Sequence, residues 1–194
     1  MTRSPRFIVL AGLLAVAALA AGGCGGGTSS VASETGSEVA ATDEGTYLEV
    51  GGLKYQVEIS RQLNPTDAED RDYLIGLPSG DTAGPGDLWF AVFMRVENDG
   101  DKPEPATADY TITDTQNHTF RPVQLSNANA FAYRPLTLQP GSLVPVPNSA
   151  AAEGPIQGAL VLFKLNSDDL QNRPLVLHIG QGGAGQSASV ELDL

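Results

Sequence analysis

The sequence predicts an all-β protein whose strands pack as an antiparallel sandwich. Three observations lead to this prediction. Apolar and polar residues alternate with a period of two over several segments, which places one face of each strand in a core and the other in water. Turn-forming residues separate these segments, since the 194-residue chain contains 22 Gly and 13 Pro. No segment with a helical pattern is long enough to form an independent helix.

The first expected element is an export leader over residues 1–23. Arg3 and Arg6 give it a positively charged tip, and the uncharged, mostly apolar run 7–21 follows. A charged tip, a short apolar run and small residues at the end are typical of a secretory signal peptide. The run is shorter than the roughly 20 residues that a transmembrane helix needs. We therefore expect residues 1–23 to be removed from the mature protein.

Cys24, the only cysteine of the chain, directly follows this leader. A lone cysteine in an exported protein cannot form an internal disulfide, so it calls for another explanation. The tetrapeptide Ala21-Gly22-Gly23-Cys24 resembles the acylation signal of bacterial lipoproteins, with Ala21 where that family usually has Leu. The resemblance implies a diacylglyceryl group on Cys24 and anchorage to the extracytoplasmic face of the cell membrane, which two or more acyl chains make stable. The alternative is an ordinary secreted protein with a cysteine near its cleavage site.

Residues 24–45 are expected to be the lipidated cysteine and a disordered linker. Residues 25–45 are rich in Gly, Ser, Thr, Ala and acidic residues and contain no Lys, Arg or aromatic residue. Such a segment buries too little apolar area to offset its ordering entropy. The remaining residues, 46–194, suit one folded domain that is large enough to be stable without disulfides.

The charge of the chain excludes one class of partner. Removal of Arg3 and Arg6 with the leader leaves nine basic residues against 23 acidic ones, a net charge of −14. Nucleic-acid binding needs a basic surface, so we expect no nucleic-acid partner. Attraction to anionic lipids is also disfavoured, so membrane contact is expected through the acyl chains alone.

The strands of the folded part are expected from alternation bounded by turn residues. They are predicted over residues 53–60, 88–96, 108–114, 119–124, 142–146, 156–165, 174–180 and 189–194. In the first of them, Leu53, Tyr55, Val57 and Ile59 form the apolar face. The strand 88–96 is apolar on both faces, so we expect it to be covered on both sides.

Helical content is expected to be small. Residues 68–74 are predicted to form one or two turns capped by Thr66 or Asp67. Residues 167–172 are predicted to form another short turn, capped by Ser167. Neither turn is long enough to be stable without packing against the sheets.

Three segments carry a second resemblance. They are the strand and turn 92–98 (VFMRVEN), the turn Leu138-Gln139-Pro140-Gly141 and the strand 158–163 (GALVLF). Over residues 47–194 the chain resembles the telokin-like lipoproteins of Gram-positive bacteria, which are mostly of unknown function. The resemblance implies an immunoglobulin-like β-sandwich over 46–194 and no catalytic residues. The segment 64–85 has no place in that pattern.

Phe131, Tyr133 and Arg134 are the candidate ligand-binding residues. They lie in the long connection 125–140, and loops carry binding residues more often than strands do. A contact surface formed by 125–140 together with 64–85 at one end of the sandwich is therefore expected. Packing in the core is the alternative explanation for the two aromatic residues.

Four acidic residues within a short stretch are the candidate metal ligands: Asp67, Glu69, Asp70 and Asp72. Their oxygens suit Ca²⁺, but the EF-hand pattern needs Gly where Asp72 lies, so a solvated acidic turn is the alternative. The two histidines, His118 and His178, are too few for a recognisable zinc site. We expect no cofactor.

The sequence offers little for catalysis. Residues 180–185 spell G-x-G-x-x-G, but a strand pattern follows where the dinucleotide fingerprint requires a helix, so a hairpin loop is expected. No serine lies in G-x-S-x-G. We therefore predict a lipid-anchored binding or structural accessory protein of the cell surface that is not an enzyme. Its partner would be an envelope or extracellular protein or a glycan.

Two alternatives remain open at this point. One is an envelope hydrolase that uses His178 or a close pair of carboxylates with a raised pKa in a concave pocket. The other is a Ca²⁺-stabilised adhesin module built on the four acidic residues of the 67–72 stretch.

Overall fold

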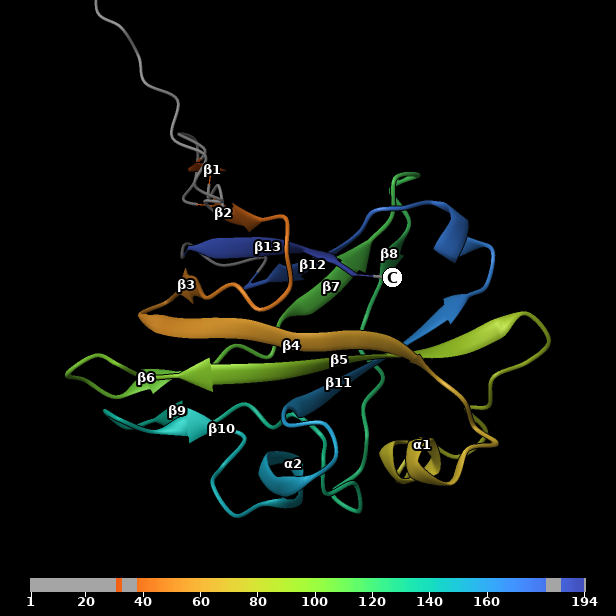
Figure 1. Ribbon diagram of the computed structural model, residues 1–194, viewed down its shortest axis with the longest axis horizontal. Helices are drawn as coiled ribbons and strands as arrows, with labels where there is room; N and C mark the ends of the chain where they lie inside the picture. Colours follow the sequence, from red (N-terminus) through yellow and green to blue (C-terminus); the bar gives the residue numbers. More distant parts are fainter. Residues whose placement is uncertain (1–30, 33–37, 181–185, 194) are drawn as a thin grey trace, which may run out of the picture.

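Two β-sheets lie face to face in the computed structural model, which describes residues 31–32, 38–180 and 186–193 (Figure 1). The predicted leader, Cys24 and most of the predicted linker lie outside the described residues. The all-β class and the sandwich arrangement predicted from the sequence are confirmed.

The first sheet has strands from both ends of the described chain. In spatial order they are β1 (Val31–Ala32), β2 (Glu38–Ala41), β13 (Ser187–Leu192), β12 (Leu175–Ile179), β7 (Tyr110–Thr113) and β8 (Thr119–Phe120). All neighbours in it are antiparallel except β2 and β13, which are parallel.

The second sheet is centred on the longest strands. It consists of β10 (Leu143–Val144), β5 (Asp87–Glu97), β4 (Leu53–Leu63) and β3 (Leu48–Val50), with β11 (Ala159–Asn166) also paired to β5. A separate ribbon pairs β6 (Glu104–Pro105) with β9 (Thr137–Leu138). The helical segments are α1 (Ala68–Tyr73), α2 (Ala150–Glu153) and the 3₁₀ turn η1 (Asp169–Gln171).

Strand β5 is buried on both faces, as its sequence predicts. One face packs against the first sheet and belongs to a cluster that we call the inter-sheet core; its β5 members are Leu88, Phe90, Val92, Met94 and Val96. The other face belongs to a second cluster, the outer core; its β5 members are Trp89, Ala91 and Phe93. In the described part of the chain the outer core is covered by α1 and by irregular chain from the segments 64–85 and 123–132, and not by a sheet.

The alternation predicted for residues 53–60 is interrupted by a bulge. The pairing register between β4 and β5 shifts between Val57 and Ile59, because an extra residue reverses the faces of the strand. Ile59 is therefore 40% exposed, although the pattern places it in the core, and Ser60 is buried instead. The backbone N–H of Ser60 donates to a carboxylate oxygen of Glu44 at 2.9 Å.

Three local predictions differ from the structure. Glu38–Ala41 form β2 beside β13, so regular structure begins before residue 46. The predicted strand 119–124 ends after Phe120, because Pro122 cannot donate to a ladder. Asp67 caps α1 as predicted, but Ser167 does not cap η1, whose preceding residue Asp168 makes no side-chain capping bond. The helix α2, capped by Ser149, was not predicted.

Within the described part of the chain, no helix has the length and apolar character needed to span a bilayer.

Candidate functional site

The segment bearing the predicted ligand-binding residues runs along the edge of β11. The Leu160 N–H donates to the Phe131 carbonyl at 2.8 Å, and the Tyr133 N–H donates to the Leu160 carbonyl at the same distance. Ala132 thereby forms a parallel bridge with Leu160. The backbone of this connection is therefore fixed by the sheet and does not form a free loop.

Tyr133 is a member of the inter-sheet core, with 8% of its surface exposed. Its hydroxyl donates to the Thr107 carbonyl at 2.8 Å, while the Thr107 N–H donates to the Tyr55 hydroxyl at 2.8 Å. Its ring meets that of Tyr110 edge to face at 5.2 Å. Burial raises the pKa of Tyr110 and of Tyr133 well above the usual value, so both hydroxyls stay neutral at any physiological pH.

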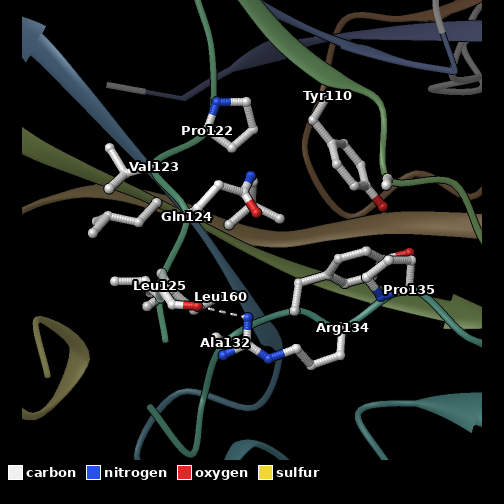
Figure 2. Close-up of a pocket in the computed structure, with 13 residues that line it drawn as sticks. Tyr110, Pro122, Val123, Gln124, Leu125, Ala132, Arg134, Pro135 and Leu160 are labelled. Atoms are coloured by element: carbon white, nitrogen blue, oxygen red, sulfur yellow. Dashed lines mark hydrogen bonds between the residues drawn. The ribbon is translucent and has the colours of Figure 1, made fainter. Parts of the chain in front are cut away.

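Arg134 and Phe131 are also engaged in contacts within the protein. Figure 2 shows the Arg134 guanidinium turned toward the backbone of its own connection, where it donates to the Leu125 carbonyl at 3.0 Å and to the Ser126 carbonyl at 2.6 Å. The Phe131 ring meets that of Tyr73 edge to face at 4.8 Å. A ligand would have to compete with these contacts.

A cavity of about 110 Å³ adjoins Tyr133 and Arg134, with Tyr110 and Gln124 also in its wall (Figure 2). Sites for small organic ligands usually measure about 300–1,000 Å³, whereas liquid water takes about 30 Å³ per molecule. The cavity therefore suits a few waters and is too small for a sugar ring with its hydroxyls. The ligand-binding role of Phe131, Tyr133 and Arg134 stays a prediction.

The two segments expected to form a contact surface do lie together. The Asn129 side-chain amide donates to the carbonyls of Tyr73 and Ile75, both at 2.9 Å, and the Ser126 N–H donates to the Gly76 carbonyl at 2.8 Å. They cover the outer core instead of projecting from the end of the sandwich. Their main contribution to the fold is to bury the second face of β5.

The acidic stretch of α1 is built into the fold in part. Asp67 accepts hydrogen bonds from the backbone N–H groups of Glu69 and Asp70 and caps the helix. Asp70 is buried, forms an ion pair with Arg61 and accepts from the Asn64 N–H at 2.7 Å. Glu69 and Asp72 are exposed. The Ca²⁺ site predicted on these four residues stays a prediction, but two of its carboxylates already have structural partners.

The two histidines lie in different surroundings. His178 is on β12, between the buried residues Leu177 and Ile179, and its Nε2 lies 2.8 Å from the Thr113 hydroxyl oxygen. His118 is in the β7–β8 turn, where its Nδ1 lies 2.9 Å from a carboxylate oxygen of Asp114. Neither histidine lines the cavity of Figure 2.

Asp114 does not have the raised pKa that the hydrolase alternative requires. Burial by itself raises the pKa of this carboxyl, but hydrogen bonds from the His118 backbone and ring, the Asn172 amide and the Gln116 backbone outweigh burial and lower it. The ionised Asp114 is therefore suited to hold a turn or a cation, and it is a poor general acid.

The glycine-rich motif lies mostly outside the described residues. Gly180 is described, and its φ of +78° is a left-handed conformation that glycine adopts readily. Residues 181–185 are not described. The strand β13 begins at Ser187, so a strand and not a helix follows the motif, as the hairpin interpretation predicts.

An exposed apolar groove was not predicted from the sequence. Leu136, Leu143, Val146 and Pro147 line a hollow of about 400 Å³ beside β9 and β10. Val146 is 54% exposed and Leu136 39% exposed. Leu143 and Val146 lie in the predicted strand 142–146 and Leu136 in the predicted connection 125–140, and nothing in these patterns indicates that the side chains gather on one surface.

Comparison with known proteins gives a limited result. No family model matches the chain, and no curated protein matches it. Two similar solved structures are the yjhA protein from Bacillus subtilis and an uncharacterized beta-sandwich protein from Clostridium difficile. The first has 12% identity and a TM-score of 0.47, and the match covers 78% of this chain and 99% of that one. The second has 9% identity and a TM-score of 0.41, and the match covers 81% and 95% of the two chains.

Proposed function

We propose that the chain is an exported lipoprotein whose β-sandwich is a binding or structural accessory module on the extracytoplasmic face of the cell membrane. The observation that carries the proposal is the position of the only cysteine, Cys24, directly after a charged tip and a short apolar run. The mature chain, with a net charge of −14, is not attracted to anionic lipid by its charge, so the acyl group supplies the membrane contact.

The sheet topology supports one orientation of the domain on its anchor. The described chain begins with β1, which forms one edge of the first sheet beside β2. This edge is therefore the part of the domain nearest to Cys24. The opposite edge of the same sheet, formed by β7 and β8, is presented away from the membrane.

The distance to the membrane is short. Because β1 pairs with β2, only the six residues 25–30 lie between Cys24 and the first described strand. A chain of six residues reaches at most about 20 Å. The module therefore works close to the lipid surface, on partners that reach the same layer: an envelope protein, an extracellular protein or a glycan.

A binding or accessory role is proposed in preference to catalysis because the residues that the hydrolase alternative requires are not in place for it. Neither His178 nor His118 lines the cavity beside Tyr133. The carboxyl beside His118, that of Asp114, has a lowered pKa and not the raised pKa that a general acid needs.

The anchoring proposal is tested by fractionation and mass measurement of the protein made in a bacterial host that processes lipoproteins. We expect the native chain in the membrane fraction, with a mass above that of the polypeptide from Cys24 to Leu194 by one diacylglyceryl group or more. Cys24→Ser should move the protein to the soluble fraction, whereas the control Ser29→Ala should not. A membrane-bound Cys24→Ser protein, or a native protein with the bare polypeptide mass, would contradict the proposal.

The binding role is tested separately by photo-crosslinking on intact cells. A crosslinking residue at Gln116, in the β7–β8 turn at the edge away from the anchor, is compared with one at the exposed Asp43, which follows β2 at the edge next to the anchor. A partner captured from Gln116 and absent from Asp43 supports a binding module with the proposed orientation. Capture of no protein or glycan from either position would argue against it.

A further inference from the structure

We propose that Asp114, His118 and Asp169 form a binding site for a divalent transition-metal ion such as Zn²⁺. Within the described ranges, these three are the residues whose potential metal-ligand atoms lie together, all within 4.8 Å of one another. The site is independent of lipidation and of the proposed accessory role, because it depends only on side chains of the folded domain.

The fold brings the three residues together from distant parts of the chain. Asp114 and His118 flank the turn that joins β7 to β8, and Asp169 begins η1, just before β12. Because β7 and β12 are neighbours, the turn and η1 lie at the same end of the first sheet. The Thr115 N–H donates to the Asn172 carbonyl at 3.1 Å and fixes the two loops to each other.

Hydrogen bonds orient each carboxylate so that one of its oxygens lies near the imidazole. In Asp114, Oδ1 accepts from the N–H groups of Gln116 at 2.9 Å and His118 at 2.8 Å, while Oδ2 lies 2.9 Å from His118 Nδ1 and also accepts from the Asn172 amide at 3.0 Å. In Asp169, Oδ2 accepts from the Asn166 N–H at 2.9 Å, while Oδ1 lies 3.5 Å from His118 Nδ1. Hydrogen bonds to the carboxylate are a usual way in which a protein orients carboxylate ligands of a metal.

A small cation could be held by the three atoms after a modest movement of the side chains. With metal–ligand distances of about 2.0–2.2 Å, tetrahedral geometry places neighbouring ligand atoms about 3.3–3.6 Å apart. The distances from His118 Nδ1 to the two carboxylates, 2.9 Å and 3.5 Å, are close to this range, and all three atoms lie within 4.8 Å of one another, so binding requires the carboxylates to draw together around the ion. Two carboxylates and a neutral imidazole would balance a charge of +2.

The donor set favours a transition metal over calcium. Imidazole nitrogen suits Zn²⁺, Cu²⁺ and Ni²⁺, whereas Ca²⁺ takes six to eight oxygen ligands. Asp114 is buried and rigid, and His118 has 58% of its side chain exposed, so an ion can enter from solvent. Three protein ligands leave at least one position for water or for a group of a partner molecule.

The test uses the full chain carrying Cys24→Ser, which removes the thiol as a competing ligand. Titration with ZnCl₂ in an isothermal calorimeter should show one site. His118→Gln and Asp169→Asn should each weaken binding by tenfold or more. Asp168→Asn, which alters the neighbouring exposed acid, and His178→Gln, which alters the other histidine, should leave the affinity within about twofold.

A readout other than affinity separates metal ligation from an ordinary ion pair. X-ray absorption at the zinc edge should show a shell of nitrogen and oxygen with one imidazole, and this imidazole signal should be lost in His118→Gln. CaCl₂ should not compete at equal concentration. The proposal is overturned if Zn²⁺ does not bind, or if it binds equally well to His118→Gln and Asp169→Asn; the three residues then form only a hydrogen-bonded cap on the turn.

Discussion

The inter-sheet core and the outer core share the strand β5 and differ in what covers them. The inter-sheet core lies between two hydrogen-bonded sheets, and strands from both contribute to it. The outer core lies beneath α1 and irregular chain, and these covers are joined by side-chain hydrogen bonds and ion pairs. Apolar contact alone therefore does not hold the outer layer in place, because each loop must also satisfy its own buried backbone groups.

Because their covers differ, we expect the two cores to respond differently to mutation. Loss of packing between the sheets affects every strand at once, so it should lower the free energy of global unfolding. Loss of a polar contact in the outer layer should open that layer before the rest of the protein, because local unfolding occurs in regions that have few stabilising contacts. Trp89, the only tryptophan, lies in the outer core, so its fluorescence reports on the outer layer.

The largest effect is expected in the inter-sheet core, with Phe90→Ala. Phe90 is fully buried, so its truncation should cost about 3–5 kcal/mol of unfolding free energy. The midpoint of urea unfolding should shift to lower urea, and the shift should be the same when unfolding is monitored by far-UV circular dichroism and by Trp89 fluorescence. Two separate transitions would show that the cores are not coupled through β5.

A smaller, local effect is expected from Asn129→Ala. The variant removes the amide that bonds the carbonyls of Tyr73 and Ile75, and a buried group left without a partner costs about 1–3 kcal/mol. Hydrogen exchange should become faster in α1 and the 125–134 segment and stay unchanged in β12 and β13. Asn127→Ala, which alters an exposed asparagine of the same segment, is the control. Uniformly faster exchange would contradict the division into two layers.

Arg61→Met should weaken the same layer by a smaller amount, about 1–2 kcal/mol. The change removes the charged partner of the buried Asp70 carboxylate, which keeps the hydrogen bond from the Asn64 N–H, and it retains an aliphatic side chain at residue 61. The double variant Arg61→Met, Asp70→Asn should recover part of the loss, because it removes the unpaired charge. If the double variant loses more unfolding free energy than the two single variants lose together, the ion pair does not have the role proposed here.

The smallest effect is a pH dependence at the rim of the outer core. A hydrogen bond from the Gly84 N–H and the nearby Lys164 lower the pKa of Asp87 below its usual value of 3.8, although burial opposes them. A lowered pKa in the folded state adds stability above pH 3.8, and this contribution is lost as the pH falls through the folded-state value. Trp89 fluorescence should therefore change with acid before the circular dichroism does.

The matched variant for this pH dependence is Asp87→Asn. It should reduce the acid sensitivity of the fluorescence, whereas Asp101→Asn, at an exposed turn, should not. An unchanged acid titration in Asp87→Asn would show that other carboxylates control the outer layer.

Much of the fold could be predicted because it depends on local pattern. The alternation of β5 and β13, the two-sided burial of β5 and the Asp67 cap are all visible in neighbouring residues. The exposure of Ile59 could not be predicted, because a bulge depends on the partner strand. The residues on either side of the register shift, Val57 and Ile59, are both apolar, so the alternation continues through it. The strand at Glu38–Ala41 was missed because its composition is that of a linker, and its pairing with β1 and with the edge of β13 leaves no local pattern.

The candidate sites were harder to predict than the fold. Phe131, Tyr133 and Arg134 were chosen because loop residues are often free to bind, but this connection is tied to β11 and to its own carbonyls. Asp114 and His118 lie four residues apart, which is visible in the sequence, but Asp169 joins them only through the pairing of β7 with β12.

Residues close together in the chain were enough to indicate the longer strands, their turns and the two-faced central strand, and they place Cys24 directly after a charged tip and a short apolar run. The tertiary structure decided which irregular segments cover the outer face of β5 and which side chains from distant segments meet. Those outcomes depend on closing long loops and satisfying buried polar groups, and neither leaves a local pattern.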